Sequence, residues 1–87
     1  MNTAVKLSRE QIFEEIRREL TALFDLRSEQ IALGARLYED LDLDSLDAID
    51  LVVRLQELTN KRIGPQQFKS VRTVEDVVDT VEQMLTQ

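Results

Sequence analysis

The chain has 87 residues, 43% of them hydrophobic, which predicts one small globular unit, a single domain over residues 1–87. It has neither cysteine nor histidine, which excludes disulfides, thiolate catalysis and the usual zinc ligands. Its net charge of −6 disfavours nucleic acid as a partner and favours a basic protein. We find no signal peptide and no apolar run that approaches the roughly 18 residues of a membrane span, and we therefore expect a cytoplasmic protein.

The first helix is expected over about residues 8–24. Ser8 and Gln11 have the spacing of a capping box, in which each side chain accepts a backbone N–H at the start of the helix. Leu7 and Ile12 stand at the two positions of a hydrophobic staple. The expected core face consists of the apolar residues that recur at helical spacing, namely Ile12, Phe13, Ile16, Leu20, Leu23 and Phe24.

Residues 25–44 show no sustained period and are expected to form a long, structured first loop. Ser28 to Ile31 is expected to form one helical turn, and Gly34 is expected to supply a backbone conformation closed to other residues. The loop is too apolar for a freely solvated linker. We expect it to pack over the core through Ile31, Leu33, Leu37, Leu41 and Leu43.

A second helix is expected from about Ser45 to Leu58, with Asp44 or Ser45 as its N-cap and Asn60 as a left-handed stop. At about 100° per residue, one apolar stripe of this helix forms a sufficient core face. That stripe contains Ala48, Leu51, Val52, Leu55 and Leu58.

The same helix carries a second apolar stripe, which we call the outer stripe, formed by Leu46, Ile49 and Val53. Asp50 and Glu57 border it. A small bundle cannot readily bury both stripes, so we interpret the outer stripe as a docking surface with a charged rim. The alternative is that the first loop covers it.

Two further helices complete the expected fold. Pro65 fits the first position of a short helix through Phe68, and Thr73 starts the last helix with Asp76 at the capping-box position. The buried stripe of the last helix is expected to be Val74, Val77, Val78, Val81 and Leu85. The predicted fold class is all-α, a small four-helix bundle with three main helices, one short helix and a long structured first loop.

The negative charge is gathered around Ser45. Residues 39–50 hold six acids and no base, whereas the other 75 residues hold 11 of each. An EF-hand starting at Asp40 would need glycine at its sixth position and glutamate at its twelfth, where this chain has Ser45 and Leu51, so no metal site is expected. A nucleophilic serine needs a base, usually histidine, so no catalytic residue is expected either. Taken alone, Ser45 reads as a helix cap within a solvated acidic helix start.

The motif Asp44-Ser45-Leu46-Asp47, preceded by Tyr38-Glu39-Asp40-Leu41, resembles the signature of acyl carrier proteins. The resemblance extends over nearly the whole chain. It implies a carrier rather than an enzyme, because a separate phosphopantetheinyl transferase moves 4′-phosphopantetheine from coenzyme A onto the serine, here Ser45 with Asp44 as part of the motif. The thiol of that arm holds acyl groups as thioesters, which would give a chain without cysteine its sulfur chemistry.

The resemblance also implies a docking face and an acyl site on a monomeric protein. The face matches the outer stripe and its acids, and it would meet basic patches on acyl-transfer and ketosynthase-type enzymes. Its residues are Leu46, Asp47, Ile49, Asp50, Val53 and Glu57. The residues that either line an acyl site or simply pack in the core are Leu55, Ile63, Phe68 and Val74.

The chain departs from fatty-acid carriers at Arg54 and Gln56 and in the basic residues Lys61, Arg62, Lys69 and Arg72. These departures favour a dedicated carrier of fatty-acid-like, polyketide or aryl-polyene synthesis, and residues 42–77 are similar to carriers of bacterial aryl-polyene gene clusters. No glycine pair precedes Ser45, which disfavours peptidyl carriers. The main alternative is an unmodified acidic helical protein-interaction module. A hydrolase using Asp44 or Asp47 is a third, less supported class.

Overall fold

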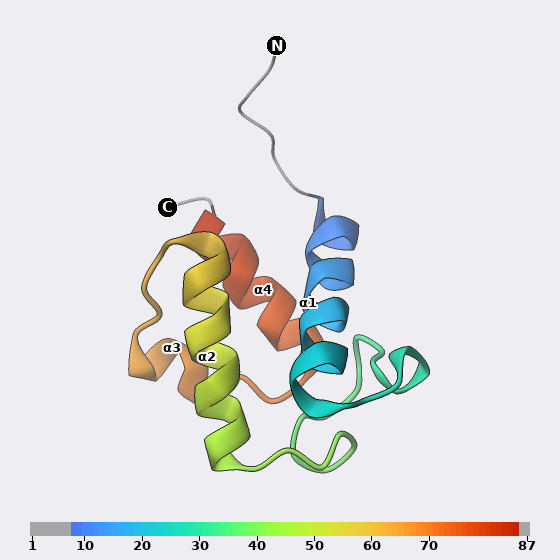
Figure 1. The fold of residues 1–87 in the computed structure, drawn as a ribbon. Coiled ribbons are helices and arrows are strands. Elements are labelled where there is room, and N and C mark those ends of the chain that lie inside the picture. Colours follow the sequence, from blue (N-terminus) through green and yellow to red (C-terminus); the bar gives the residue numbers. More distant parts are fainter. Residues whose placement is uncertain (1–7, 86–87) are drawn as a thin grey trace.

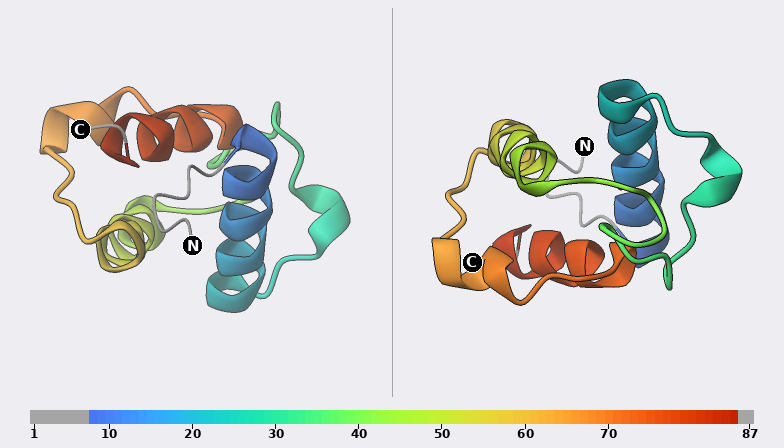
Figure 2. Two further views of the ribbon diagram at one scale, coloured as in Figure 1. Left: turned by 90° about the horizontal axis from the view of Figure 1, so that it is seen from above. Right: turned by 90° about the horizontal axis from the view of Figure 1, so that it is seen from below.

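The protein is a small helical bundle, and the computed structural model describes residues 8–85, without the side chains of residues 65 and 66. Its elements are α1 (Arg9–Phe24), the 3₁₀ turn η1 (Ser28–Gln30), α2 (Ser45–Thr59), α3 (Pro65–Lys69) and α4 (Val74–Leu85). Helices α1, α2 and α4 pack against one another, while η1 and α3 lie on opposite sides of the bundle (Figures 1 and 2). The predicted all-α fold is confirmed. In this described part, no helix combines the length and apolar character needed to cross a membrane.

The helix ends follow from short-range hydrogen bonds, as the sequence predicts. The Ser8 hydroxyl accepts the Gln11 N–H at 3.2 Å, and the Gln11 side chain accepts the Ser8 N–H at 2.9 Å. At the end of α2, Asn60 adopts the predicted left-handed conformation, with φ of 56°. The staple between Leu7 and Ile12 lies partly outside the described residues.

The first loop packs over the core and is tied to the start of α4. The Leu37 N–H donates to the Arg72 carbonyl at 2.9 Å, and the Val74 N–H donates to the Ala35 carbonyl at 3.0 Å. Four of the five predicted apolar residues of the loop are buried, namely Ile31, Leu37, Leu41 and Leu43. Leu33 remains 41% exposed, and it contributes through its backbone, since its carbonyl accepts the Glu75 N–H at 2.9 Å.

The expectation for Gly34 is wrong. No glycine among residues 8–85 has a positive φ, and in this loop the left-handed conformations belong to Asp25, at the end of α1, and to Asp42, with φ of 56° and 59°. Aspartate tolerates that region better than most residues because its short polar side chain can bond locally. The tight bends therefore lie at the two ends of the loop, after α1 and before α2, rather than in its middle.

The core is formed by the inward faces of α1, α2 and α4 together with the loop. Two predicted core residues are exposed instead, Leu58 at 45% and Leu85 at 39%. Both lie in the last turn of their helices, where they border a cleft of about 210 Å³ that is also lined by residues of α1. Met84 is fully buried and fills the interior at the end of α4.

The start of α4 depends on the ionised carboxylate of Asp76. Its Oδ2 accepts the N–H groups of Arg72 at 2.9 Å and Thr73 at 3.1 Å, and the Thr73 hydroxyl accepts the Asp76 N–H at 3.2 Å, so the predicted capping box is confirmed. The bond from the Arg72 N–H is the main reason that the pKa of Asp76 is lowered in the folded protein. The carboxylate therefore contributes its full stabilisation when the pH is above the ordinary aspartate pKa of about 4. This contribution is lost as the pH falls through the lowered pKa of the folded protein.

Asp76→Asn is expected to lower the free energy of unfolding by about 1 kcal/mol at pH 7, because an amide oxygen is a weaker acceptor for the two N–H groups. Thermal or urea unfolding of both proteins at a series of pH values will measure this. The difference between them should narrow as the pH drops below about 4. Asp50→Asn, at an exposed site, is the control. A difference for Asp76→Asn that stays constant down to acid pH would contradict the role of its charge.

Candidate functional site

Ser45 is the first residue of α2, and its side chain is exposed. The N-cap of the helix is Asp44, whose carboxylate accepts the Asp47 N–H at 2.9 Å, while the Asp47 carboxylate accepts the Asp44 N–H at 3.1 Å. Of the two predicted caps, the structure therefore has Asp44 and not Ser45. Within residues 8–85 the Ser45 hydroxyl has no hydrogen-bond partner, so the residue carries an accessible hydroxyl that the helix does not need.

The start of α2 also offers backbone donors beside that hydroxyl. The capping pair satisfies two of the four N–H groups that a helix start leaves without an intrahelical partner. In the part of the chain that the structure describes, the N–H groups of Ser45 and Leu46 have no acceptor. A helix N-terminus with available N–H groups favours an anion, although the carboxylates of Asp44 and Asp47 oppose one. The residues present therefore fit a phosphate ester on Ser45 that stays in contact with solvent.

The six acids around Ser45 do not form one cluster. Glu39 and Asp40 lie against Arg36, at 3.5 Å and 3.3 Å from its guanidinium. The Arg36 N–H, followed by its guanidinium, lowers the pKa of Asp40, while the side-chain hydrogen bond to Asp40, followed by the charge of Glu39, raises the pKa of Arg36. Asp44 and Asp47 cap the helix. Asp42 and Asp50 are exposed and have no ion pair or hydrogen bond from their side chains among the described residues.

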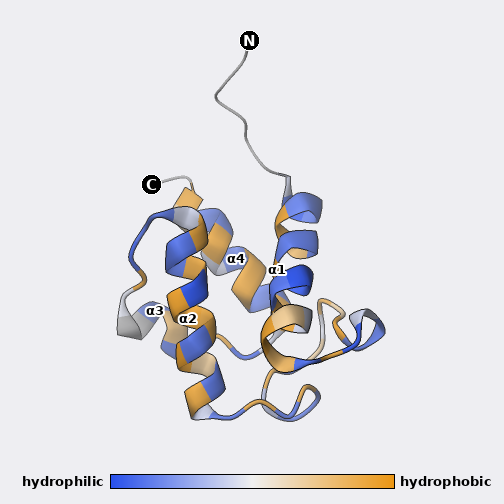
Figure 3. Ribbon diagram, in the orientation of Figure 1, coloured by the Kyte–Doolittle hydropathy of each residue, from blue (hydrophilic) through white to orange (hydrophobic). Residues whose placement is uncertain are grey.

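The outer stripe of α2 is open to solvent. Leu46, Ile49 and Val53 are 71%, 58% and 48% exposed, and apolar and polar segments alternate along α2 in Figure 3. The first loop does not cover the stripe, so that alternative is wrong. Of the acids predicted beside it, Asp50 is exposed and Glu57 lies 3.7 Å from Arg54, which also pairs with Glu19 at 3.1 Å.

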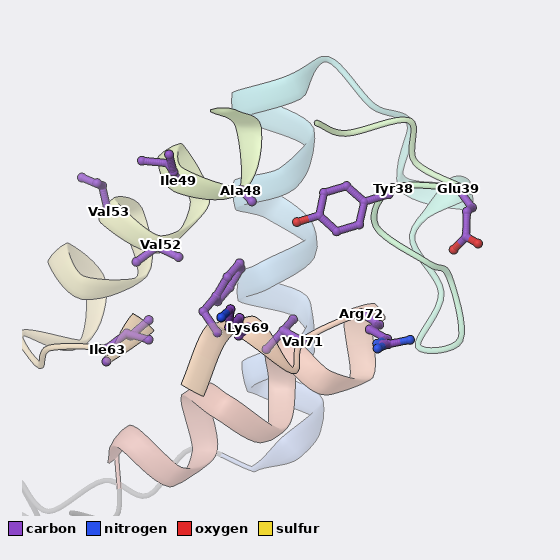
Figure 4. A pocket seen from close by; sticks show the side chains of 12 residues that line it. Tyr38, Glu39, Ala48, Ile49, Val52, Val53, Ile63, Lys69, Val71 and Arg72 are labelled. Atoms are coloured by element: carbon purple, nitrogen blue, oxygen red, sulfur yellow. The ribbon is translucent and has the colours of Figure 1, made fainter. Parts of the chain in front are cut away.

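A cleft of about 880 Å³ runs between α2 and the segment around α3 (Figure 4). Ile49 and Val53 of the outer stripe lie on its α2 side, and Tyr38 projects from the first loop with its hydroxyl directed into it. The cleft is lined by Tyr38, Glu39, Ala48, Ile49, Val52, Val53, Ile63, Gly64, Phe68, Lys69, Val71 and Arg72.

Two of the four residues named for an acyl site line this cleft, namely Ile63 and Phe68. Leu55 and Val74 do not, because they are 1% and 0% exposed and belong to the core. Sequence reasoning missed Tyr38 and Val71, which reach the cleft from two loops and leave no periodic signal. Ala48 and Val52 could have been found. They form the edge of the core stripe that adjoins the outer stripe, and a residue between two apolar faces can border the space between two helices.

The departure at Gln56 has a structural reason. Its side-chain oxygen accepts the Ile63 N–H at 2.9 Å and so ties α2 to the segment that forms the far wall of the cleft. Gln56 is partly buried, where an uncharged acceptor avoids the desolvation cost of a carboxylate.

Comparison with known proteins agrees with this geometry. The family described as Phosphopantetheine attachment site matches residues 5–81. The chain belongs to the acyl carrier protein family. It is 47% identical over 75 residues to Acyl carrier protein 2 of Ralstonia nicotianae, covering 86% of this chain and 93% of that protein. It is 34% identical over 79 residues to the acyl carrier protein of Coprothermobacter proteolyticus, covering 91% and 96%.

The fold of this acyl carrier protein is also similar to solved structures. The crystal structure of the Thermotoga maritima acyl carrier protein matches with a TM-score of 0.78 and 23% identity, over 90% of this chain and 91% of that chain. The acyl carrier protein from Enterococcus faecalis matches with a TM-score of 0.72 and 21% identity, over 88% and 98%.

Membership of the family defines what the protein is. It is a carrier and not a catalyst, and its cofactor is covalent 4′-phosphopantetheine. Acyl carrier proteins work with a transferase that adds this arm and with the enzymes of acyl synthesis. The arm supplies the thiol that the chain itself lacks.

Proposed function

We propose that Ser45 is the attachment site of the arm. The observation that carries this proposal is the exposed hydroxyl of Ser45 at the first residue of α2, which has no hydrogen-bond partner within residues 8–85. Asp44 supports the site by capping the helix, so that modification of Ser45 removes no bond on which the fold depends. The cleft between α2 and α3 begins one turn beyond Ser45, at Ala48, and Ile63 and Phe68 give it apolar surface on which an acyl chain can rest.

Incubation of the wild-type chain with coenzyme A, magnesium and a broad-specificity phosphopantetheinyl transferase is expected to add the mass of one arm. Intact-mass measurement detects the addition, and peptide mapping is expected to place it on the fragment that contains Ser45. An unmodified chain after treatment with several such transferases would favour the alternative, an unmodified acidic interaction module. An arm found on another fragment would contradict the assignment of Ser45.

We propose further that the outer stripe and its acids dock partner enzymes. The stripe is apolar, exposed and adjacent to Ser45, and Asp50 lies at its border without an ion pair among residues 8–85. Partners with basic patches would therefore meet both a complementary charge and an apolar contact. The partners in question are the phosphopantetheinyl transferase and acyl-transfer and ketosynthase-type enzymes.

Asp50→Lys is expected to slow loading by the transferase about tenfold at low salt, because a rim charge acts mainly on the association rate. The difference in loading rate between the variant and wild type should shrink at about 0.5 M salt, where exposed charges are screened. Initial rates of loading at several salt concentrations measure this. Glu29→Lys makes the same charge change at an exposed site on η1, on the opposite side of the bundle from α3, and serves as the control. Equal losses in both variants would show that only net charge matters.

We propose that this carrier serves a pathway more specialised than primary fatty-acid synthesis. The support is the basic character of the residues after α2, where Arg62, Lys69 and Arg72 are exposed. Carriers of aryl-polyene or polyketide synthesis remain the favoured class. We place the protein in the cytoplasm, where coenzyme A and the transferase would meet it.

A further inference from the structure

Tyr38 has a polar group that the fold leaves unused. Its side chain is 45% exposed, and in the part of the chain that the structure describes its hydroxyl has no hydrogen-bond partner. Figure 4 shows this hydroxyl directed into the cleft of about 880 Å³ between α2 and the segment around α3. Because a tyrosine hydroxyl both donates and accepts hydrogen bonds, Tyr38 offers a ligand of the cleft a polar group that the core does not need.

The backbone on either side of Tyr38 is fixed, which gives its side chain a definite direction. The preceding residue, Leu37, is buried, and its N–H donates to the Arg72 carbonyl at 2.9 Å. Three residues beyond Tyr38, the Leu41 N–H donates to the Arg36 carbonyl at 3.0 Å. A group on such a backbone loses little freedom when it binds a ligand, so its hydrogen bond is made at a low entropic cost.

The other polar side chains that line the cleft do not fill the same role. The Glu39 carboxylate lies 3.5 Å from the Arg36 guanidinium, and Figure 4 shows Glu39 and Arg72 directed away from the cleft. Lys69 and Arg72 are exposed, and charged groups of this kind stay hydrated at the end of an apolar stem. Among the described residues that line the cleft, Tyr38 alone has an uncharged polar side chain.

The inner lining of the cleft is apolar, and Tyr38 stands at its edge. The inner residues are buried or partly buried, namely Ala48, Val52, Ile63, Phe68 and Val71. An acyl group gains most from such a lining when its hydrocarbon tail lies inside and its thioester stays at the edge, in contact with solvent. The carbon atoms next to the thioester are then the part of the acyl group that lies at the edge with Tyr38.

The Tyr38 hydroxyl therefore distinguishes acyl groups by what they carry beside the thioester. A saturated chain that covers the hydroxyl removes water from it and supplies no hydrogen bond in return, which is unfavourable. An oxygen on carbon 3, as a hydroxyl or a ketone, takes the place of that water.

We propose that Tyr38 is a specificity-determining residue, which makes the cleft favour acyl groups with an oxygen on carbon 3 and a hydrocarbon tail over saturated acyl groups of the same length. This inference rests on the proposed use of the cleft by the acyl chain. It names the class of acyl group that the cleft prefers.

The test uses free thioesters, so that it does not depend on Ser45. Octanoyl-pantetheine and 3-hydroxyoctanoyl-pantetheine are titrated separately into the isotope-labelled, unmodified chain, and the NMR shifts of backbone amides around the cleft give two dissociation constants. Wild type is expected to favour the hydroxylated thioester. Tyr38→Phe keeps the ring and removes only the hydroxyl, so it should shift the ratio of the two constants toward the octanoyl thioester about fivefold, the effect of one neutral hydrogen bond.

Val53→Ala is the matched control, because it trims an apolar lining residue that is 48% exposed. It should weaken both thioesters by the same factor and leave their ratio as in wild type. Tyr38→Phe should unfold at the wild-type temperature, because its hydroxyl makes no bond in the fold. A ratio that Tyr38→Phe leaves unchanged would overturn the proposal, and so would an absence of amide shifts around the cleft with either thioester.

The loaded chain gives a second readout. The transferase loads wild type and Tyr38→Phe from octanoyl-coenzyme A or 3-hydroxyoctanoyl-coenzyme A, and cleavage by hydroxylamine then reports how accessible the thioester is. Tyr38→Phe is expected to speed cleavage of the 3-hydroxyoctanoyl group about fivefold and to leave cleavage of the octanoyl group unchanged. Equal acceleration of both would contradict the proposal, since Tyr38 would then act on the arm. Intact mass shows separately whether loading occurs, so a failure of attachment at Ser45 is distinguishable from a failure of this inference.

Discussion

Ser45→Ala is expected to abolish loading and to leave the fold unchanged. The hydroxyl is the only group lost, and the helix start depends on Asp44 and Asp47. Alanine at the first position of a helix is well tolerated, so the free energy of unfolding should change by less than about 0.5 kcal/mol. Intact mass after treatment with coenzyme A and the transferase measures loading, and thermal unfolding measures the fold.

The matched control is Ser28→Ala, which removes an exposed hydroxyl at the first residue of η1. It should load as fast as wild type. Two results would contradict the role given to Ser45. An arm on the Ser45→Ala chain would place attachment elsewhere, and a loss of about 1 kcal/mol or more in stability would show that the serine acts as a helix cap after all.

The helix ends were predictable because they depend on residues three or four positions apart. The capping boxes at Ser8 and Thr73 and the left-handed stop at Asn60 all involve such short-range bonds. The choice between Asp44 and Ser45 as the cap of α2 needed the structure, because both side chains can accept an N–H from the same helix start. The resemblance to acyl carrier proteins pointed to Ser45 independently of this choice.

Features that depend on how the helices cross were not predictable from periodicity. The cleft joins α2 to Tyr38 and Val71, which are distant in sequence and belong to loops. Leu58 and Leu85 have the spacing of core residues but lie in final turns of their helices, where they stay exposed. The pairing of Arg36 with Glu39 and Asp40 likewise requires the fold of the first loop, and it reduces the charge that a partner meets near Ser45.

Leu51→Ala is expected to destabilise the protein by about 2–5 kcal/mol, whereas Ile49→Ala should change stability by less than about 0.5 kcal/mol. The two residues are only two positions apart on α2 but lie in opposite environments, since Leu51 is 0% and Ile49 58% exposed. Removal of the Leu51 side chain leaves a cavity in the modest core that a domain of this size can build. The midpoint of thermal unfolding should then fall by more than about 10 °C.

The rates of reaction with partner enzymes should show the reverse order, with the larger loss in Ile49→Ala and the smaller in Leu51→Ala. Ile49→Ala removes apolar contact area from the outer stripe and is expected to lower transferase kcat/KM about fivefold, because truncation of an exposed apolar contact at an interface costs about 1 kcal/mol. Leu51→Ala, assayed well below its melting temperature, should retain most of its rate, because its side chain does not reach the surface. Loss of stability and of transfer in equal measure for Ile49→Ala would mean that the outer stripe belongs to the core. The contrast between two positions only two residues apart therefore separates the face that holds the bundle together from the face that partners recognise.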